Sequence, residues 1–377
     1  MLKPGTLLLS RSGSVGRPVL VPSWMEGTAV QDDILKIVSS DDRLPRYLYT
    51  YLTSSLGQSL LIDTAFGSVI QHIKVDHVRD IPILIPSNHL LTQISRIIEL
   101  AQSNREKARD ALIGACSQVY SINGLLELTT EGTSKSNCTG CHDSFWILSH
   151  DVMSGNNDGS EYRLDAHFYN PTAQQAVANI KNCRSVVKTV GEVAHGVLMG
   201  PRFKRNYVES THGVPFLSGK NIVQIRPTDL KYLSNLQMAD MQDLIIKKGW
   251  TLITCSGTIG RTCFVWENYE NYAASQHILR VIPDESQIDP GYLYAFLSSR
   301  YGYEQILRYR HGSVIDEVTD KQIEHVLVPC PSRKDQEAIG DMVRAAYEKR
   351  AEAIRLEDEA QAILMSELTK AQASKGE

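Results

Sequence analysis

Residues 201–208 read PRFKRNYV and place cations and an amide side by side among aromatic residues. Arg matches the hydrogen-bonding edge of guanine, Asn or Gln matches adenine, and Ser or Thr suits either base. Lys and Arg also neutralise phosphates, which hold a protein on a duplex without reading its sequence. The segment therefore carries side chains suited to reading DNA from an exposed loop. The candidate readers are Arg202, Lys204, Arg205 and Asn206, followed by Lys220 and Asn221.

The charge of the chain is uneven along its length. The formal net charge is only -4, which by itself does not suggest a nucleic-acid partner. Residues 181–261, however, hold 12 Lys and Arg against 5 Asp and Glu, whereas residues 334–377 hold 7 against 10. This polarity suits a DNA-contacting domain beside a protein-binding segment, although any one cation could instead belong to a solvated face. The candidates for phosphate contacts are Lys188, Arg202, Lys204, Arg205, Lys220, Lys247 and Lys248.

A second candidate set lies in a short phrase that the chain contains twice, as RSGSVG at 11–16 and as CSGTIG at 255–260. The glycines permit a turn with positive φ or a close backbone approach, and the hydroxyl residues offer short hydrogen-bonding groups. Two interpretations stay open: a structural hairpin, or a loop whose final arginine contacts phosphate. The candidate residues are Ser256, Thr258 and Arg261 in one copy and Arg11, Ser12, Ser14 and Arg17 in the other.

The phrase is part of a longer internal repeat. LLLSRSGSVGR (7–17) matches TLITCSGTIGR (251–261), and GSVIQHI (67–73) matches GSVIDEV (312–318). So many matches at one spacing indicate a duplicated structural unit. In this frame Asp32 and Asp33 fall on Gln276 and His277, so a nuclease-type carboxylate pair is not preserved. Surface or base-reading roles are the better interpretation of Gln276 and His277.

The repeated unit predicts an α+β domain. LLLS and TLIT are short apolar strands before the glycine turn, and DILKIV and HILRVI are second strands. YLYTYLTSSLG (47–57) and YLYAFLSSRYG (292–302) have helical spacing, and IPILIP and VLVPCP predict a final strand that ends at proline.

A long helix is predicted after each domain, over 90–116 and 334–368. Apolar residues recur there in alternating steps of three and four, which is the pattern of a helix that pairs with another helix. The two seams share one phase in the repeat, so we expect the helices to pair with each other as a coiled coil. Packing of each helix on its own domain is the alternative. The seam residues are Ile94, Ile97, Ala101, Ala108, Ile339, Met342, Ala346, Ala353 and Leu356.

Other motifs carry little weight. Cys138, Cys141 and His142 match a haem-attachment pattern and could form half of a zinc site, but no second cysteine pair has suitable spacing. GVPFLSGKN (213–221) lacks the spacing and the hydroxyl residue of a phosphate-binding loop, and YNPT (169–172) lacks the motif of amino-methyltransferases. We therefore expect no metal site and no catalytic residues in this chain.

Length and composition are those of a soluble protein with two or three domains. The 377 residues are 42% hydrophobic and 22% charged. No apolar run is long enough for a membrane helix, the start lacks a secretory signal, and seven cysteines suit a reducing compartment. A cytoplasmic location is expected.

Taken together, these phrases resemble the specificity (S) subunits of type I restriction-modification systems. The resemblance rests on GTLLLSRSGSVGR, ASQHILRVI, RLDAHFYNP (163–171), FLSGKNI (216–222) and DQEAIGDMV (335–343), in the order typical of that family. It implies two target-recognition domains that read the two halves of a split DNA site. Each domain would be followed by a long helix, and the two helices would form an antiparallel coiled coil that holds the domains apart. The expected boundaries are 1–87 for the carboxyl-terminal part of the first recognition domain, 88–122 for the first helix, 123–158 for a linker, 159–332 for the second recognition domain and 333–372 for the second helix. The second domain begins near Tyr162, so the matching start of the first domain would precede Met1.

The resemblance also implies partners and a place in phage defence. Two methyltransferase (M) subunits and restriction/motor (R) subunits would join this chain on double-stranded DNA. S-adenosylmethionine and ATP with magnesium would bind those partners and not this chain. Three alternatives remain: a half-type recognition protein of another phage-defence system that pairs with a second copy, a self-sufficient modification enzyme, and a helical adaptor that does not bind DNA.

Overall fold

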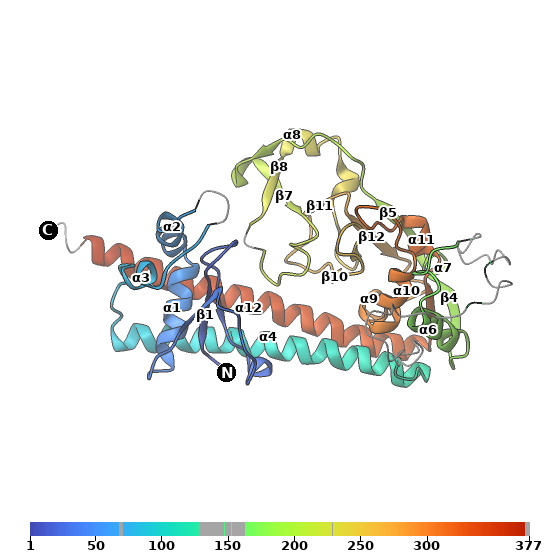
Figure 1. Cartoon of the computed structure of the whole chain (residues 1–377), viewed down its shortest axis with the longest axis horizontal. Coiled ribbons are helices and arrows are strands. Elements are labelled where there is room, and N and C mark those ends of the chain that lie inside the picture. The colour runs from blue at the N-terminus through green and yellow to red at the C-terminus, as the bar shows by residue number, and fades with distance from the viewer. Residues whose placement is uncertain (68–70, 129–146, 148–151, 153–162, 228, 374–377) are drawn as a thin grey trace, which may run out of the picture. The chain divides into compact units, whose positions relative to one another are not determined.

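The computed structural model describes residues 1–67, 71–128, 147, 152, 163–227 and 229–373 (Figure 1). The chain divides into two compact units, which we call unit 1 (Met1–Arg109 with Lys349–Glu377) and unit 2 (Asp110–Glu348). Two long helices contribute to both units: α4, Asn88–Asn123, and α12, Arg333–Ala373. Most of the predicted linker, with Cys138, Cys141 and His142, lies outside the described residues.

Unit 1 is built on a small antiparallel sheet in the order β2-β1-β3. Its strands are β1 (Leu7–Ser10), β2 (Pro18–Leu20) and β3 (Ile34–Ile37). The short helix η1 (Ser23–Met25) follows β2, and three helices follow the sheet: α1 (Arg43–Thr53), α2 (Ser55–Asp63) and α3 (Val75–Arg79). Leucines of β1 and tyrosines of α1 form the core together with the first turns of α4 and the last turns of α12.

Unit 2 contains a sheet of the same kind that is wider by one strand, in the order β10-β9-β12-β5. A second sheet has the order β11-β7-β8-β6, and β13 pairs with β4. The strands are β4 (Val186–Thr189), β5 (Ala194–Met199), β6 (Tyr207–Val208), β7 (Gly213–Leu217), β8 (Lys231–Ser234), β9 (Thr251–Thr254), β10 (Thr262–Phe264), β11 (Ala273–Ala274), β12 (Ile278–Pro283) and β13 (Leu327–Cys330).

The helices of unit 2 lie mainly before and after these sheets. They are α6 (Pro171–Lys181), α7 (Val190–Val193), η2 (Ser210–His212), α8 (Asn235–Met238), η3 (Gln242–Leu244), α9 (Pro290–Ser298), α10 (Arg300–Arg308) and α11 (Asp320–Glu324). One large apolar core joins α9, α10 and the β9–β12 sheet to the adjacent ends of α4 and α12, and a smaller core supports β7 and β8. None of the described helices combines the length and apolar character that crossing a membrane requires.

The duplicated unit is visible in the strand register. Leu7 of β1 pairs with Leu20 and Ile37, and Thr251 of β9 pairs with Phe264 and Val281. Each of these positions differs from its counterpart by 244 residues, as the repeated phrase does. The predicted strands before the glycine turn and the predicted second strands are therefore confirmed, and the α+β fold class with them.

Each stretch with helical spacing forms two helices instead of one. Ser54 and Ser299 have extended backbones and accept a hydrogen bond from the amide of Gly57 or Gly302, which begins the next helix. A Cβ on Gly57 would lie 2.1 Å from the Tyr51 carbonyl oxygen, so the two helices can meet this closely only at glycine. The serine and the glycine together set the bend in both copies.

The predicted final strand forms in only one copy. VLVPCP contains β13, which pairs with β4, but residues 81–86 are not a strand. The strand prediction for IPILIP was wrong because a short apolar run needs a partner strand. The described residues of unit 1 contain no counterpart of β4.

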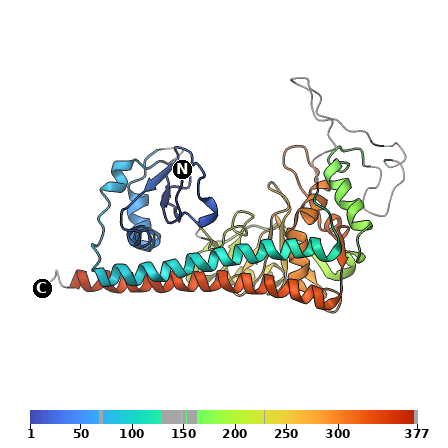
Figure 2. The same cartoon turned by 90° about the horizontal axis from the view of Figure 1, so that it is seen from below.

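The long helices pair in opposite directions, and each unit contains part of the pair (Figure 2). In unit 1, Arg105 of α4 and Glu357 of α12 form an ion pair at 2.8 Å. In unit 2, a Cβ on Gly114 of α4 would lie 3.0 Å from the Met342 methyl carbon of α12. Most of the predicted seam is buried, while Ile97, Met342 and Leu356 are half-buried at its margin. The prediction of paired helices is confirmed.

Candidate nucleic-acid interface

The repeated phrase forms the same turn in both units. The backbone amides of Gly16 and Arg17 donate to the carbonyl and the hydroxyl of Ser10, and those of Gly260 and Arg261 donate to the same two groups of Thr254. All four glycines have positive φ between 70° and 84°, which L side chains rarely adopt. The phrase thus encodes the same hairpin turn in both units.

A loop from further along the chain packs on this turn in unit 2. His311 and Glu317 exchange backbone hydrogen bonds of 3.0 and 2.7 Å, and the amide of Gly257 donates to the Asp316 carbonyl at 3.0 Å. The Ser256 hydroxyl lies 3.5 Å from the Glu317 carboxylate. The turn is therefore fixed from two sides, while the side chain of Thr258 remains exposed.

Residues 201–206 of the PRFKRNYV segment precede β6 and have no regular secondary structure, but the side chain of Gln237 holds their backbone. Gln237 Nε2 donates to the Lys204 carbonyl at 2.6 Å, and Gln237 Oε1 accepts from the Asn206 amide at 3.1 Å. These contacts use only the backbone of Lys204 and Asn206, so both side chains are exposed. A rigid loop with exposed polar side chains is the arrangement that base reading requires.

Arg205 is oriented by two neighbours. Its guanidinium donates to Gln276 Oε1 at 2.6 Å and lies 5.1 Å from the centre of the Phe216 ring. Gln276 in turn lies 3.0 Å from the His277 imidazole, and the His277 carbonyl accepts from the Cys255 amide. The structure therefore brings together predicted residues that are 71 positions apart in the chain.

These contacts define a continuous polar patch. Arg202 is exposed and lies 3.8 Å from Glu317, which connects the PRFKRNYV segment to the glycine turn. We call this surface the polar patch; it comprises Arg202, Arg205, Ser256, Gln276, His277 and Glu317. It presents guanidinium, amide, imidazole, hydroxyl and carboxylate groups, which include the partners of every type of base edge.

Several other predicted residues are engaged elsewhere. Lys188 in β4 donates to Gln287 at 2.8 Å, and Lys220 pairs with Asp229. Asn221 is 2% exposed, and its amide bonds to the backbone and hydroxyl of Ser218 and to Asp229. Asn221 is thus occupied in closing a turn, which does not support the prediction that it reads a base edge.

Arg280 supports the polar patch from inside the core, and the sequence analysis did not identify it. It is completely buried in β12, and its guanidinium donates to the backbone carbonyls of Ala274 and, at 2.8 Å, Ile278. These carbonyls flank the segment that carries Gln276 and His277. Burial lowers the pKa of Arg280 to about 10. Its place inside an apolar strand, HILRVI, is the only signal in the sequence, because an isolated charge at a core position requires a specific partner.

The corresponding turn of unit 1 has a different set of polar groups. The Ser12 hydroxyl contacts the Asp33 carboxylate at 2.6 Å and the His72 imidazole at 2.8 Å. Ser14 is exposed, and Arg11 and Arg17 are half-buried. In the repeat, the Asp33 carboxylate thus occupies the position of His277, and the His72 imidazole occupies the position of Glu317.

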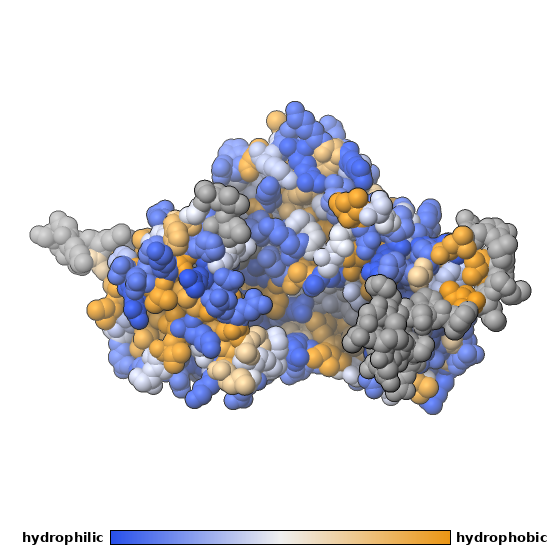
Figure 3. Space-filling model, in the orientation of Figure 1, coloured by the Kyte–Doolittle hydropathy of each residue, from blue (hydrophilic) through white to orange (hydrophobic). Residues whose placement is uncertain are grey.

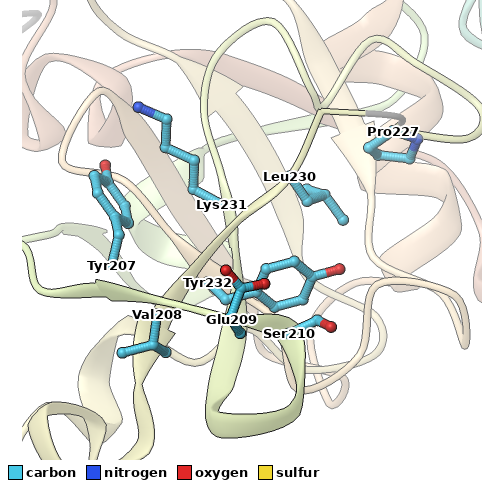
Figure 4. Close-up of a pocket in the computed structure, with 8 residues that line it drawn as sticks. All are labelled: Tyr207, Val208, Glu209, Ser210, Pro227, Leu230, Lys231 and Tyr232. Carbon is cyan, nitrogen blue, oxygen red and sulfur yellow. The ribbon is translucent and has the colours of Figure 1, made fainter. Parts of the chain in front are cut away.

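A shallow hollow of about 530 Å³ lies beside β6 and β8 (Figure 4). The Lys231 ammonium lies 4.7 Å from the centre of the Tyr207 ring, and both side chains project to one side of the strands. The surface of this second sheet is mostly hydrophilic around α8 (Figure 3). Among the described residues, no three His, Cys, Asp or Glu side chains are grouped as ligands of a metal ion would be.

The sequence of residues 184–357 matches the family model described as "Type I restriction modification DNA specificity domain". This segment is a type I DNA specificity domain. It includes the whole polar patch, and the family match covers slightly less than half of the chain. The resemblance deduced from the sequence is thereby confirmed.

Comparisons with individual proteins accompany the family match. A search of curated proteins found no match. Among solved structures, the HsdS subunit from Thermoanaerobacter tengcongensis is similar with 13% identity and a TM-score of 0.35, over 96% of this chain and 80% of that chain. The type I S subunit from M. genitalium is similar with 12% identity and a TM-score of 0.36, over 98% of this chain and 82% of that chain.

Proposed function

We propose that the specificity domain reads one half of a split DNA site through the polar patch, and that the sheet and turn of unit 1 contribute to reading the other half. The observation that carries the proposal is Arg205, whose guanidinium is oriented by Gln276 and Phe216 on an otherwise exposed loop. An oriented guanidinium discriminates guanine from other bases by about 1–3 kcal/mol.

The two units would read different sequences because their turns differ. Ser12 contacts Asp33 and His72, whereas Ser256 contacts Glu317. The paired helices α4 and α12 would set the number of base pairs between the half-sites. Two methyltransferase subunits would bind along these helices and modify adenines with S-adenosylmethionine, and a restriction and motor subunit that uses ATP and magnesium would join them. As a component that acts on genomic and incoming DNA, the complex would work in the cytoplasm.

The decisive experiment maps methylated bases in DNA from cells that express this chain with the methyltransferase encoded beside it. A new motif in two unequal parts would support the proposal. Arg205→Ala should abolish or relax one part only, whereas Lys321→Ala, on exposed α11, should leave the motif unchanged. The absence of any new methylation despite a stable complex would contradict the proposal.

The alternative is a half-type recognition protein that pairs with a second copy. It predicts a symmetric motif and a dimer of this chain without methyltransferase in solution. The unlike turns of units 1 and 2 favour the split, unequal motif.

A further inference from the structure

The loop from His311 to Glu317, which we call the GSVI loop, has a defined shape although it contains no regular secondary structure. Its ends are held by the two backbone hydrogen bonds between His311 and Glu317. Gly312 has φ +128°, and a Cβ there would lie 2.2 Å from the Ile315 carbonyl oxygen. The tip can therefore form only with glycine at this position.

This fixed tip presents apolar side chains to solvent. Val314 is 94% exposed and Ile315 is 58% exposed. Both are β-branched and stiff at χ1, so they lose little conformational freedom when they contact a partner. Holding two such residues outward in a rigid loop is unfavourable unless another molecule covers them.

The GSVI loop lies directly beside the polar patch. Its last residue, Glu317, belongs to the patch, and its Asp316 carbonyl accepts from Gly257 in the glycine turn. The Arg310 guanidinium lies 3.9 Å from the Asp316 carboxylate at the base of the loop. Arg202 and Arg310 thus both lie near the carboxyl-terminal end of the loop, each beside a carboxylate.

We propose that Val314 and Ile315 are an apolar wedge that inserts against the base pairs of the DNA held by the polar patch. This inference rests on the proposed function. Proteins that deform DNA insert aliphatic side chains between base steps. DNA is favoured over a protein partner because the tip is continuous with the polar patch and two arginines, Arg202 and Arg310, lie at its base.

The sequence supports a contact that does not depend on the base. The same four residues, GSVI, occur at 67–70 in the other copy of the repeat, whereas the reading positions at Asp33 and His277 differ. Two half-sites of different sequence would need different readers, whereas a contact that does not depend on the base can be shared. The wedge at Val314 and Ile315 therefore contributes to affinity and DNA shape and not to the choice of base.

The test uses the full chain in complex with its methyltransferase and a duplex that carries the mapped motif, labelled at both ends and with 2-aminopurine near the half-site. The variants are Val314→Ser and Ile315→Ser. The matched control is Leu236→Ser, which removes an 87% exposed leucine from α8 in the same unit. We expect each loop variant to weaken DNA binding by about tenfold, equally for cognate and unrelated duplexes, with an unchanged dependence on salt. The 2-aminopurine signal and the bend measured by end-to-end energy transfer should fall, and the control should behave as the unaltered chain.

Two other results would contradict the proposal that Val314 and Ile315 insert into DNA. Unchanged DNA affinity and bending with a weakened methyltransferase complex would show that the tip is a protein-docking site. Unchanged DNA affinity and bending with an intact complex would show that the tip has no role in binding. Arg205→Ala separates this inference from the proposed function. If Arg205→Ala abolishes DNA binding and the loop variants do not, the wedge is refuted and the proposed function stands. If the unaltered complex does not bind the duplex, the proposed function itself is refuted.

Discussion

Arg280 shows how one buried residue can hold a segment that carries two residues of the polar patch. Its guanidinium bonds to backbone carbonyls on both sides of Gln276 and His277, so it acts on these side chains through the segment that carries them. Burying a cation is costly, and here backbone carbonyl groups accept hydrogen bonds from its two terminal nitrogens, Nη1 and Nη2.

Replacement of Arg280 should therefore affect stability and recognition together. We expect Arg280→Met to lower the free energy of unfolding by about 1–3 kcal/mol, because the carbonyls that it satisfies lose their donors inside the core. Arg280→Lys should be intermediate, since an ammonium lacks the planar fork of the guanidinium. Urea unfolding and DNA binding of both variants test this, with exposed Arg333→Met as the control. A stable Arg280→Met variant with full DNA affinity would contradict the anchoring role.

The glycine turn offers a matched pair of substitutions. A Cβ on Gly260 would lie 2.9 Å from the Tyr303 ring, whereas a Cβ on Gly257 would meet nothing within 4 Å. Both residues have positive φ, so Gly257→Ala measures the backbone strain alone, about 1 kcal/mol. Gly260→Ala should cost more because the ring must also move. Equal melting temperatures for the two variants would show that the contact with Tyr303 is unimportant.

At the scale of elements, unit 1 contains a buried ion pair between the long helices. Glu357 of α12 accepts from Arg105 of α4 at 2.8 Å and from the Tyr49 hydroxyl of α1 at 2.8 Å, and only 6% of its side chain is exposed. Three helices thus meet at one carboxylate. Such a group gives the helix pair a register as well as stability, because the cation and the hydroxyl fit one alignment only.

Removal of this carboxylate should be strongly destabilising. We expect Glu357→Ala to lower the free energy of unfolding by about 3–5 kcal/mol, since it leaves the partly buried Arg105 without a counter-charge. Glu357→Gln should cost less because the amide oxygen still accepts a hydrogen bond. The neighbouring Glu359 is exposed, and Glu359→Ala should have almost no effect. Chemical unfolding followed by circular dichroism measures all three, and a harmless Glu357→Ala would refute the role of the ion pair.

Elements that repeat or carry strong periodicity were predictable from the sequence, and elements that depend on distant partners were not. The duplicated phrases revealed β1 and β9 with their turns, and the alternating apolar residues revealed α4 and α12. The division of one helical stretch at Ser54 escaped periodicity, because an N-cap serine looks like any other polar residue. Arg205 was recognised by its type, but its orientation depends on Gln276, which lies 71 positions further along the chain.

At the scale of the whole molecule, buried acids with raised pKa values predict a loss of stability in alkali. Burial raises the pKa of Cys255 to about 12, and burial with nearby acidic groups raises those of Tyr47 and Tyr49 to about 12. The folded state keeps these protons where the unfolded chain, with ordinary values of about 8.5–10, has lost them, so stability falls as the pH rises from about 9 towards 12. The lowered pKa of Arg280 increases stability as the pH rises above about 10, but Arg280 is a single group, whereas Cys255, Tyr47 and Tyr49 all decrease stability there.

The corresponding measurement is the urea midpoint as a function of pH. It should decrease steadily above about pH 9, and the double variant Tyr47→Phe and Tyr49→Phe should show a shallower decrease. A midpoint that is constant up to about pH 11 would mean that these phenols and the thiol titrate as they do in the unfolded chain.

Unit 1 is assembled from the first 109 residues and from a segment that begins at Lys349. During synthesis, the amino-terminal sheet therefore leaves the ribosome long before Ala360 and Leu364, which complete its core, have been translated. The intervening residues form unit 2, so the sheet of unit 1 lacks part of its core until α12 has been translated. A nascent chain arrested before α12 would expose the apolar face of α1 and α4, which chaperones would have to cover during synthesis. A premature stop codon before Ala360 would remove part of the core of unit 1 and so destabilise its amino-terminal sheet.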